Sequence, residues 1–396
     1  MDYPLLSHLY YKDKNKYDDL YRQRISAEST CVLPIKIGDN NAFYCLCPEI
    51  HNTTIRIMQL DKRISVIKKN LPEVALTQFA RKCLVDEIRF SNDIEGVYST
   101  RKELAAVLNE IENKPEKKRF YGLLNQYSML ISGNEFALNT SSDIREIYNN
   151  LVMNEIREDC PENVPDGEIF RKDIAEVTTS AQKVIHRGAY PETKIIQLME
   201  QALGVLNKNE IPVLVKISIF HYLFGYIHPF YDGNGRTSRF ISSYLLSREF
   251  EFLIGFRLSY TIKAHIKEYY NAFSECNNEK NKGDLTPFII VFLNIIREAF
   301  ENLYEALEKR SNLLSEFKAM LNENEIMSED LRAFTFILVQ AALFSNEGVT
   351  KKELEWELEI SISTIDKRLN TLRKMGLLLE EKGKPSKYLV DLNKLS

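Results

Sequence analysis

The amino-acid sequence predicts a mostly α-helical fold, and two features of its pattern lead to this prediction. Apolar residues recur every three or four positions over long stretches, which places them on one face of an α-helix. Strand-like runs are short and lie near the N-terminus, before the middle of the chain and at the C-terminus. The 396 residues, 44% of them hydrophobic, are enough for about two or three domains with cores of their own.

The N-terminal part of the sequence, residues 1–90, is predicted to be a region with a helical segment. Residues 1–55 are expected to be irregular, with aromatic residues and short strand-like runs such as AFYCLCP. The pattern is helical from about 55 to 95, with an interruption at Pro72. Gly96 then predicts the end of this helical stretch, because glycine tolerates the left-handed backbone that closes a helix.

The middle of the chain continues as a series of helices. Thr100 and Glu103 form a capping-box pattern, which predicts a helix start. Residues 160–191 hold most of the local proline and glycine and are expected to form loops with short strands. The other helices are predicted at 117–133, 142–156, 193–207 and 212–227, from 236 onward, and over 260–320.

The C-terminal part, residues 325–396, has a pattern of its own. The runs AFTFILVQAALFS, VTKKELEWELEI and SISTIDKRLNTLRKMG predict three helices, and LLLEEKGKPSKYLV predicts two strands joined by a turn. This order predicts a winged helix-turn-helix domain, with Ser363–Met375 as its recognition helix. Trp356 is expected to anchor the core of this domain.

Two kinds of partner remain open for the predicted winged helix. From Ile360 to Ser396 eight Lys or Arg residues stand against four acids, which suits contacts with DNA phosphates through residues 360–390. The preceding ELEWELE is acidic, so the domain as a whole is nearly neutral. Winged helices also dock proteins or form dimers, and a homodimer stays an alternative.

Composition predicts a cytoplasmic protein with reduced thiols. The six cysteines lack paired zinc-type spacing, and a disulfide framework is not expected in so long a chain. No apolar run approaches the length that spans a bilayer, and MDYPLLSHLYYKDKNK is a poor signal peptide. The net charge of −4 indicates no global attraction to nucleic acid or membranes.

The stretch HPFYDGNGRTSR, residues 228–239, holds the densest chemistry of the sequence, between two helices predicted to be buried. Its GNG triplet can turn consecutive backbone N–H groups toward one point, which favours an anion such as phosphate. Arg236 and Arg239 can reach further phosphate oxygens, and Asp232 can hold a magnesium ion against them. His228 is the only group of the loop whose ordinary pKa suits removal of a hydroxyl proton near pH 7.

This stretch resembles the HPFx(D/E)GNGRxxR signature of the Fic family at every defined position. The resemblance implies a Fic-type helical core over 91–315, and transfer of AMP from ATP to a Ser, Thr or Tyr hydroxyl of a target protein. It implies that His228 deprotonates the hydroxyl and that Asp232 binds Mg²⁺. The residues implied to hold the phosphates are Gly233, Asn234, Gly235, Arg236 and Arg239. A lysine-bearing variant of GNGR is usual in the phosphotransferase branch, so the intact GNGR favours AMP transfer.

The stretch SNDIEG, residues 91–96, resembles the inhibitory (S/T)xxxE(G/N) motif of the same family, with Ser91, Glu95 and Gly96 at the defined positions. The resemblance implies that Glu95 pairs with Arg239 in the γ-phosphate position and misaligns ATP. The alternative is that Glu95 is a solvated residue near a helix end. Two other functions stay open: a deAMPylase that uses the same glutamate to orient water, and a DNA-binding regulator whose Fic domain senses nucleotide. An intact histidine argues against the regulator, because sensing needs no base.

The same resemblance implies a hairpin within 164–191 that lines the active site and binds a target segment by strand pairing. A loose GxxxR element, Gly167 and Arg171, precedes it. The histidine of this segment is expected to be an exposed loop side chain. The candidate flap consists of Lys183, Val184, Ile185, His186, Arg187 and Gly188.

Overall fold

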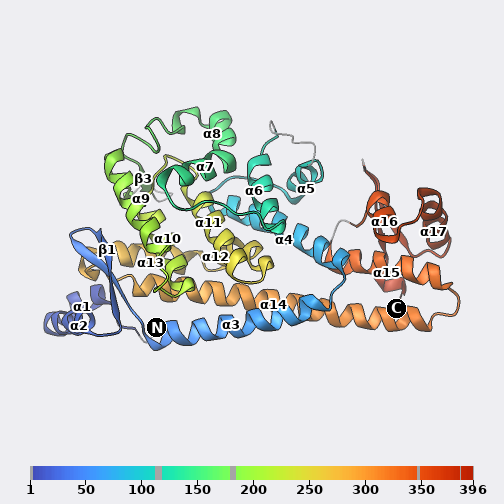
Figure 1. The fold of residues 1–396 in the computed structure, drawn as a ribbon, viewed down its shortest axis with the longest axis horizontal. Coiled ribbons are helices and arrows are strands. Elements are labelled where there is room, and N and C mark those ends of the chain that lie inside the picture. Colours follow the sequence, from blue (N-terminus) through green and yellow to red (C-terminus); the bar gives the residue numbers. More distant parts are fainter. Residues whose placement is uncertain (1–2, 112–117, 179–183, 346–347, 384, 396) are drawn as a thin grey trace. The chain divides into compact units, whose positions relative to one another are not determined.

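The computed structural model of the protein describes residues 3–111, 118–178, 184–345, 348–383 and 385–395. Over these residues helices dominate, and the strands form three two-stranded antiparallel hairpins (Figure 1). The predicted mostly α-helical fold is therefore confirmed. None of the helices that these residues form combines the length and the hydropathy needed to cross a membrane.

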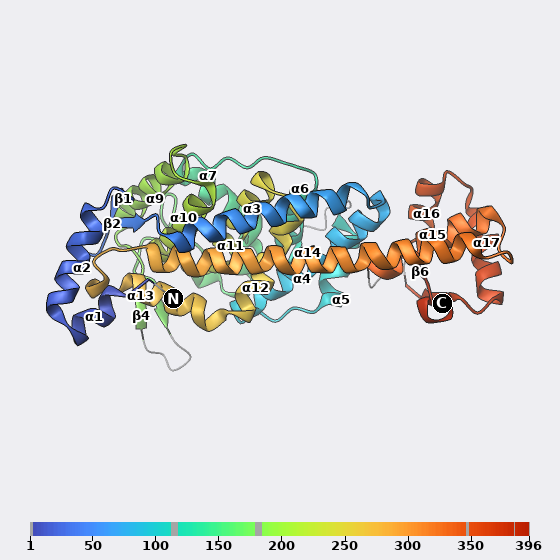
Figure 2. The ribbon, with the colours of Figure 1, turned by 90° about the horizontal axis from the view of Figure 1, so that it is seen from below.

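The chain divides into two compact units. The larger unit comprises residues 1–61 and 85–301, and the smaller unit comprises 62–84 and 302–396. Three long helices have residues in both units: α3 (Pro48–Lys69), α4 (Glu73–Ile94) and α14 (Thr286–Glu323). In the larger unit α3 lies alongside α14 (Figure 2), where Arg56 Nε is 3.6 Å from Glu301 Oε1. The functional domain limits expected from the sequence stay a prediction.

The larger unit begins with two helices and a hairpin. These are α1 (Leu6–Lys12), α2 (Lys14–Ser26), β1 (Thr30–Ile37) and β2 (Asn40–Cys45). The expectation of an irregular segment was therefore wrong for residues 6–26. The reason is chemical: α2 buries only Tyr17 and Arg24, and the one aliphatic residue between them, Leu20, is half-buried, so few apolar residues mark a helical period.

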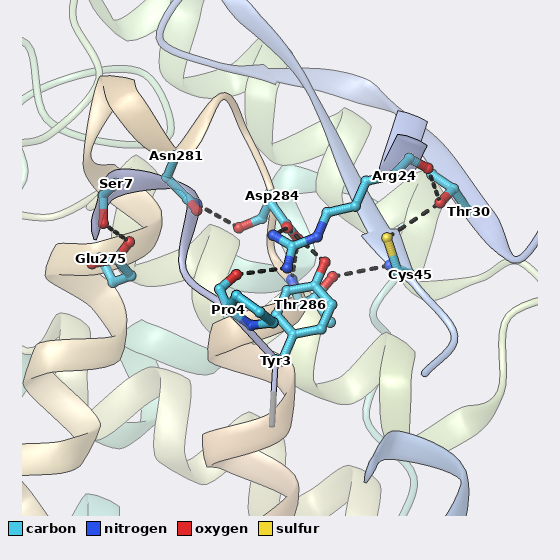
Figure 3. Close-up of polar contacts among 10 residues, drawn as sticks. All are labelled: Tyr3, Pro4, Ser7, Arg24, Thr30, Cys45, Glu275, Asn281, Asp284 and Thr286. Atoms are coloured by element: carbon cyan, nitrogen blue, oxygen red, sulfur yellow. Dashed lines mark hydrogen bonds and ion pairs between the residues drawn. The ribbon is translucent and has the colours of Figure 1, made fainter. Parts of the chain in front are cut away.

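A buried ion pair fixes this N-terminal segment to the loop before Thr286 (Figure 3). Arg24 Nη1 lies 3.1 Å from Asp284 Oδ2, and neither side chain is more than 6% exposed. The hydroxyl of Tyr3 donates to the same carboxylate oxygen at 2.7 Å, and its ring centroid lies 3.7 Å from the Arg24 guanidinium. Arg24 also donates to the carbonyl of Pro4 at 2.6 Å. These bonds compensate the desolvation of the two charges, which alone would be destabilising.

Replacing Tyr3 with phenylalanine is expected to lower the opening free energy of α1 and α2 by about 1.5–3 kcal/mol, because a bond to a buried charge is lost. Hydrogen-exchange mass spectrometry of α1 and α2 measures this change. Tyr11→Phe is the control: Tyr11 is 79% exposed, so its change should stay within about 0.5 kcal/mol. Equal exchange in the two variants would show that the buried cluster does not hold the segment.

Helices form the body of the larger unit. Its α-helices are α5 (Arg101–Asn109), α6 (Tyr121–Ile131), α7 (Ser141–Leu151), α8 (Met153–Asp159), α9 (Glu192–Leu206), α10 (Val213–Ile227), α11 (Asn234–Glu249), α12 (Leu258–Ala264) and α13 (Ile266–Asn277). Short 3₁₀ turns cover Pro161–Asn163, Phe252–Phe256 and Glu279–Asn281, and the strands β3 (Glu176–Thr178) and β4 (Val184–Arg187) form a hairpin. The predicted helix at 142–156 is interrupted at Val152, whose φ of −133° is not helical. As predicted, α10 is buried over most of its length, and so is α11.

The smaller unit contains three helices followed by a hairpin. Its elements are α15 (Glu329–Phe344), α16 (Lys351–Leu358), α17 (Ile362–Lys374), β5 (Leu378–Glu381), β6 (Lys387–Val390) and the short α18 (Leu392–Leu395). Val349 and Tyr388 exchange two backbone hydrogen bonds beside β6, at 3.0 and 2.8 Å. This order of elements agrees with the predicted order, and a winged-helix role stays a prediction.

The expectation that Trp356 anchors the core of this unit was wrong, because its side chain is 87% exposed. The helix α16 has only two turns, and its buried residue is Leu354. Two residues further along a helix, a side chain points to nearly the opposite face. Trp356 therefore points to solvent.

Candidate active site

The loop after α10 places a histidine at a sharp turn of the backbone. The last residue of α10 is Ile227, and His228 follows in the left-handed conformation, with φ 52° and ψ 63°. Its N–H still bonds the carbonyl of Phe224 at 2.9 Å. The loop is fixed by Phe230, which is fully buried and stacks on Tyr148 with ring centroids 3.6 Å apart.

The start of α11 lies at the other end of the same loop. Gly233 has a φ of 79°, and a Cβ atom there would lie 2.9 Å from Val152 Cγ2, so only glycine fits. The side chain of Asn234 bonds both the N–H and the carbonyl of Phe230, at 3.0 and 2.7 Å. The first amides of a helix lack partners within the helix and favour an anion. The loop therefore presents the N-terminus of a 16-residue helix as a preformed anion site.

Arg236, on the first turn of α11, is buried and held by a carboxylate. Its Nη1 lies 3.0 Å from Oε2 of Glu155 on α8, and its Nη2 lies 3.9 Å from Oδ1 of Asp232. Burial raises the pKa of Glu155 to about 7, although Arg236 acts in the opposite direction. Glu155 thus fixes the direction of the guanidinium beside the helix N-terminus.

Arg239, one turn later, is also buried and points to the end of α4. Its Nη1 lies 2.9 Å from Glu95 Oε1, while Nε and Nη2 donate to the hydroxyl and the carbonyl of Ser91 at 3.0 and 2.9 Å. A Cβ atom at Gly235 would collide with Glu95 Oε1, so this carboxylate lies against the start of α11. Gly96, with a φ of 73°, follows the end of α4 as predicted. The structure therefore brings together the two motifs that lie 132 or more residues apart in the sequence.

Asp232 is the residue of the loop that suits a metal ion. Its side chain is 38% exposed and borders both Arg236 and the helix N-terminus. Among the described residues no group of three or more His, Cys, Asp or Glu side chains could hold a metal by itself. Mg²⁺ commonly binds one or two carboxylates together with substrate phosphates and water. A single partly exposed carboxylate beside an anion site fits that pattern.

The surroundings of His228 keep its imidazole neutral. Burial, together with the nearby His186 and the Arg171 guanidinium, lowers its pKa to about 3. A neutral imidazole is the form that accepts a proton from a hydroxyl. A bound phosphate chain would add negative charge nearby and raise the pKa again.

In the free protein His228 is therefore expected to stay unprotonated from pH 8 to pH 5. A histidine of the unfolded chain takes up its proton near pH 6.5, so this residue lowers stability as the pH falls from about 6.5 toward 3. Nuclear magnetic resonance of labelled histidine measures the titration, with the urea-unfolded chain as the reference. A His228 signal that moves near pH 6.5 in the folded chain would contradict the prediction.

The hairpin β3–β4 lies next to His228. A Cβ atom at Gly188 would lie 2.9 Å from His228 Cβ. His186 pairs with Val177 across the hairpin, and its Nε2 lies 2.7 Å from the carbonyl of Tyr226. The expectation that His186 is an exposed loop side chain was therefore wrong: its ring is part-buried against α10. The exposed side chains of β4 include Val184 and Ile185, whereas Lys183 of the candidate flap lies outside the described residues.

Arg171 links this hairpin to the loop. The side chain is fully buried, and its Nε donates to the carbonyl of His228 at 2.9 Å. Its Nη2 donates to the carbonyl of Ala189, just after β4, at 2.8 Å. The GxxxR pattern singled out Arg171 without indicating this role. Glu155 was not singled out at all, because nothing in a helical run such as MNEIRED marks one glutamate as buried.

Comparisons with known proteins agree with this geometry. Residues 138–246 match the Fic/DOC family. Over 95 residues the chain is 34% identical to a protein named Protein adenylyltransferase Fic from Drosophila grimshawi, covering 24% of this chain and 18% of that protein. A protein of the same name from Aedes aegypti is 39% identical over 69 residues, 17% of this chain and 12% of that protein. The matches thus span less than a fifth of these curated relatives.

The fold has a relative among solved structures. A Fic family protein from Desulfovibrio desulfuricans G20 superposes with a TM-score of 0.56 at 20% identity, over 88% of this chain and 98% of that chain. Fold and site define a helical protein that presents a histidine beside the N-terminus of a buried helix. More narrowly, residues 138–246 carry a domain that matches the Fic/DOC family.

Proposed function

We propose that the protein is an adenylyltransferase that moves AMP from ATP to a Ser, Thr or Tyr hydroxyl of a target protein. One observation carries the proposal: a neutral His228 and the α11 N-terminus, with Arg236 and Arg239 at its first turns, lie at the two ends of one rigid loop. Relatives named protein adenylyltransferases support it, since one of them is 34% identical to the chain over 95 residues.

Each group of the loop has a part in the reaction. The amides of Gly233, Asn234 and Gly235 bind the phosphate chain, and the two arginines neutralise its terminal charges. Asp232 would hold Mg²⁺, which supplies further positive charge to the phosphates when bound. His228 takes the proton of the target hydroxyl as its oxygen bonds to the α-phosphorus, and pyrophosphate leaves.

Glu95 restrains this reaction in the same proposal. Its carboxylate lies 2.9 Å from Arg239 Nη1 and against Gly235, where the far end of the phosphate chain binds. ATP and Glu95 compete for one guanidinium. The ground state of the free protein is therefore the inhibited one.

The target enters along the β3–β4 hairpin. Val184 and Ile185 are exposed on β4, whose backbone ends beside His228. An extended target segment gains backbone hydrogen bonds by adding to this hairpin, which leads its hydroxyl toward the imidazole.

The position of the isotope in labelled ATP tests the proposal. The Glu95→Gly protein is incubated with Mg²⁺ and ATP labelled either at the α-phosphate or at the γ-phosphate. Protein-bound label from α-labelled ATP alone is expected. Label from the γ-position would identify a phosphotransferase, and nucleotide binding without any label would support the nucleotide-sensing regulator. Release of AMP from a premodified target by the wild-type protein, which keeps Glu95, at a higher rate than transfer would support the deAMPylase.

A further inference from the structure

One face of α17 in the smaller unit is exposed and entirely polar. The opposite face is buried through Ile365, Leu369 and Leu372. Residues three and four positions apart share a helix face. The exposed side chains at that spacing are those of Ser363, Lys367, Asn370, Thr371 and Lys374. Three turns of helix thus present hydroxyl, amide and ammonium groups to solvent, without an apolar residue among them.

The arginines of α17 form ion pairs within the smaller unit, whereas the lysines of the exposed face do not. Arg368 Nη2 pairs with Asp330 at 3.1 Å, and Arg373 Nη2 pairs with Glu380 at 2.9 Å. In the part of the chain that the structure describes, Lys367 and Lys374 make no ion pair, and the same holds for Lys382 in the turn after β5. These ammonium groups remain available to an external anion.

Two of the acidic groups near α17, Asp366 and Glu380, are paired with cations. Asp366, the acid on α17, is paired with Lys351 of α16 at 2.5 Å. On α16, Glu353 caps the helix start, and the other acids, from Glu355 on, lie in the second half of the helix. The first turn of α16 carries the exposed Lys352. Thr350 caps that turn through the N–H of Glu353 at 3.2 Å. The α16 start and the α17 face are therefore the positive parts of an otherwise balanced unit.

We propose that the smaller unit binds duplex DNA, with α17 in the major groove. The major groove admits one α-helix, and the first turns of such a helix face the base edges. Lys367 fits the acceptor pair of guanine, and Asn370 fits the donor and acceptor of adenine. Lys374, Lys382 and Lys352 contact the phosphates on either side. The five exposed side chains on this face of α17 are all polar, and the exposed Ile362 at the helix start lies outside the face; this composition favours a polyanion over a protein groove.

Salt dependence of binding by the full chain is the first test. Fluorescence anisotropy with a mixed-sequence 30-base-pair duplex is expected to show binding at 50 mM salt. The three phosphate contacts of Lys352, Lys374 and Lys382 give a slope of about −2.7 in log affinity against log salt, so binding should weaken by about 40-fold at 200 mM. Lys367→Glu with Lys374→Glu should weaken it at least about tenfold at 50 mM salt. The matched control is Lys309→Glu, an exposed lysine on α14 in the same unit, which should leave binding unchanged.

Sequence readout is the second test. Selection from a random duplex library should enrich one motif with the wild-type chain, and Asn370→Ala should relax that motif at one position while the salt slope stays the same. Three outcomes would overturn the proposal: no duplex binding at 50 mM salt by the folded chain, equal weakening by Lys309→Glu, or no enriched motif. Self-association that depends on Trp356, without duplex binding, would assign the unit to protein contacts instead. None of these outcomes bears on the isotope experiment, so the two proposals stand or fall separately.

Discussion

Replacing Glu95 with glycine is expected to raise self-adenylylation by about 100-fold. That increase corresponds to about 2.7 kcal/mol, within the range of about 1–3 kcal/mol that couples two sites in proteins. The physical reason is competition for one guanidinium, since Glu95 Oε1 lies 2.9 Å from Arg239 Nη1 and against Gly235. Ser91 keeps its two bonds to Arg239 in the variant, so the arginine stays oriented for the γ-phosphate.

The rate of label transfer from α-labelled ATP measures this effect. Two further variants test whether it depends on the charge of Glu95 and on its position. Glu95→Gln keeps the shape and loses the charge, so its rate should fall between those of wild type and Glu95→Gly. Glu135→Gly is the matched control, because Glu135 lies in an exposed loop away from the ion pair. Equal rates in folded wild type and Glu95→Gly would remove the autoinhibition from the proposal.

The structure explains why a single carboxylate can act as a firm restraint. Glu87 and Ser91 lie on one face of α4, one turn apart, and Glu95 directly follows the last residue of the helix. Glu87 is fully buried, and both its oxygens accept the N–H of Ser259 on α12 at 2.9 Å. This bond ties α4 to the larger unit two turns before Glu95. The carboxylate that meets Arg239 is therefore carried by an anchored helix.

The sequence was sufficient for the parts of the site that depend on local chemistry. The loop between α10 and α11 was predicted because two long apolar runs indicate buried helices, and the two glycines between them indicate a turn. Local capping residues predict the end of α4 at Gly96 and the start of α5 at Thr100. The Thr100 hydroxyl accepts the Glu103 N–H at 3.2 Å.

Residues whose roles depend on distant partners could not be predicted in this way. Glu155 meets Arg236 across 81 residues, and Arg171 meets the carbonyl of His228 across 57. Their helices and loops look ordinary in sequence, since burial of a charge is set by what packs against it. Trp356 shows the reverse case: a large apolar residue favours a buried position on average, yet a two-turn helix has room for little more than one buried side chain.

Replacing His228 with alanine in the Glu95→Gly background is expected to lower the rate of transfer by about 10²–10⁴-fold, the usual contribution of a positioned base. His228 lies where the loop, the hairpin β3–β4 and α11 meet, and burial keeps its imidazole in the accepting form. The arginines and amides that hold ATP belong to other residues, so nucleotide affinity should change little. The rate is measured with α-labelled ATP, and the affinity by calorimetry on the same variant.

The backbone of His228 calls for a second variant, because its φ of 52° strains an alanine at this position. Asparagine tolerates that conformation and cannot act as a base, so His228→Asn should lose the same activity without the strain. His8→Ala removes an exposed histidine of α1 and should leave the rate unchanged. If His228→Asn binds ATP as the parent does yet keeps more than about a tenth of its rate, another group takes the proton, and the mechanism proposed for this loop is wrong.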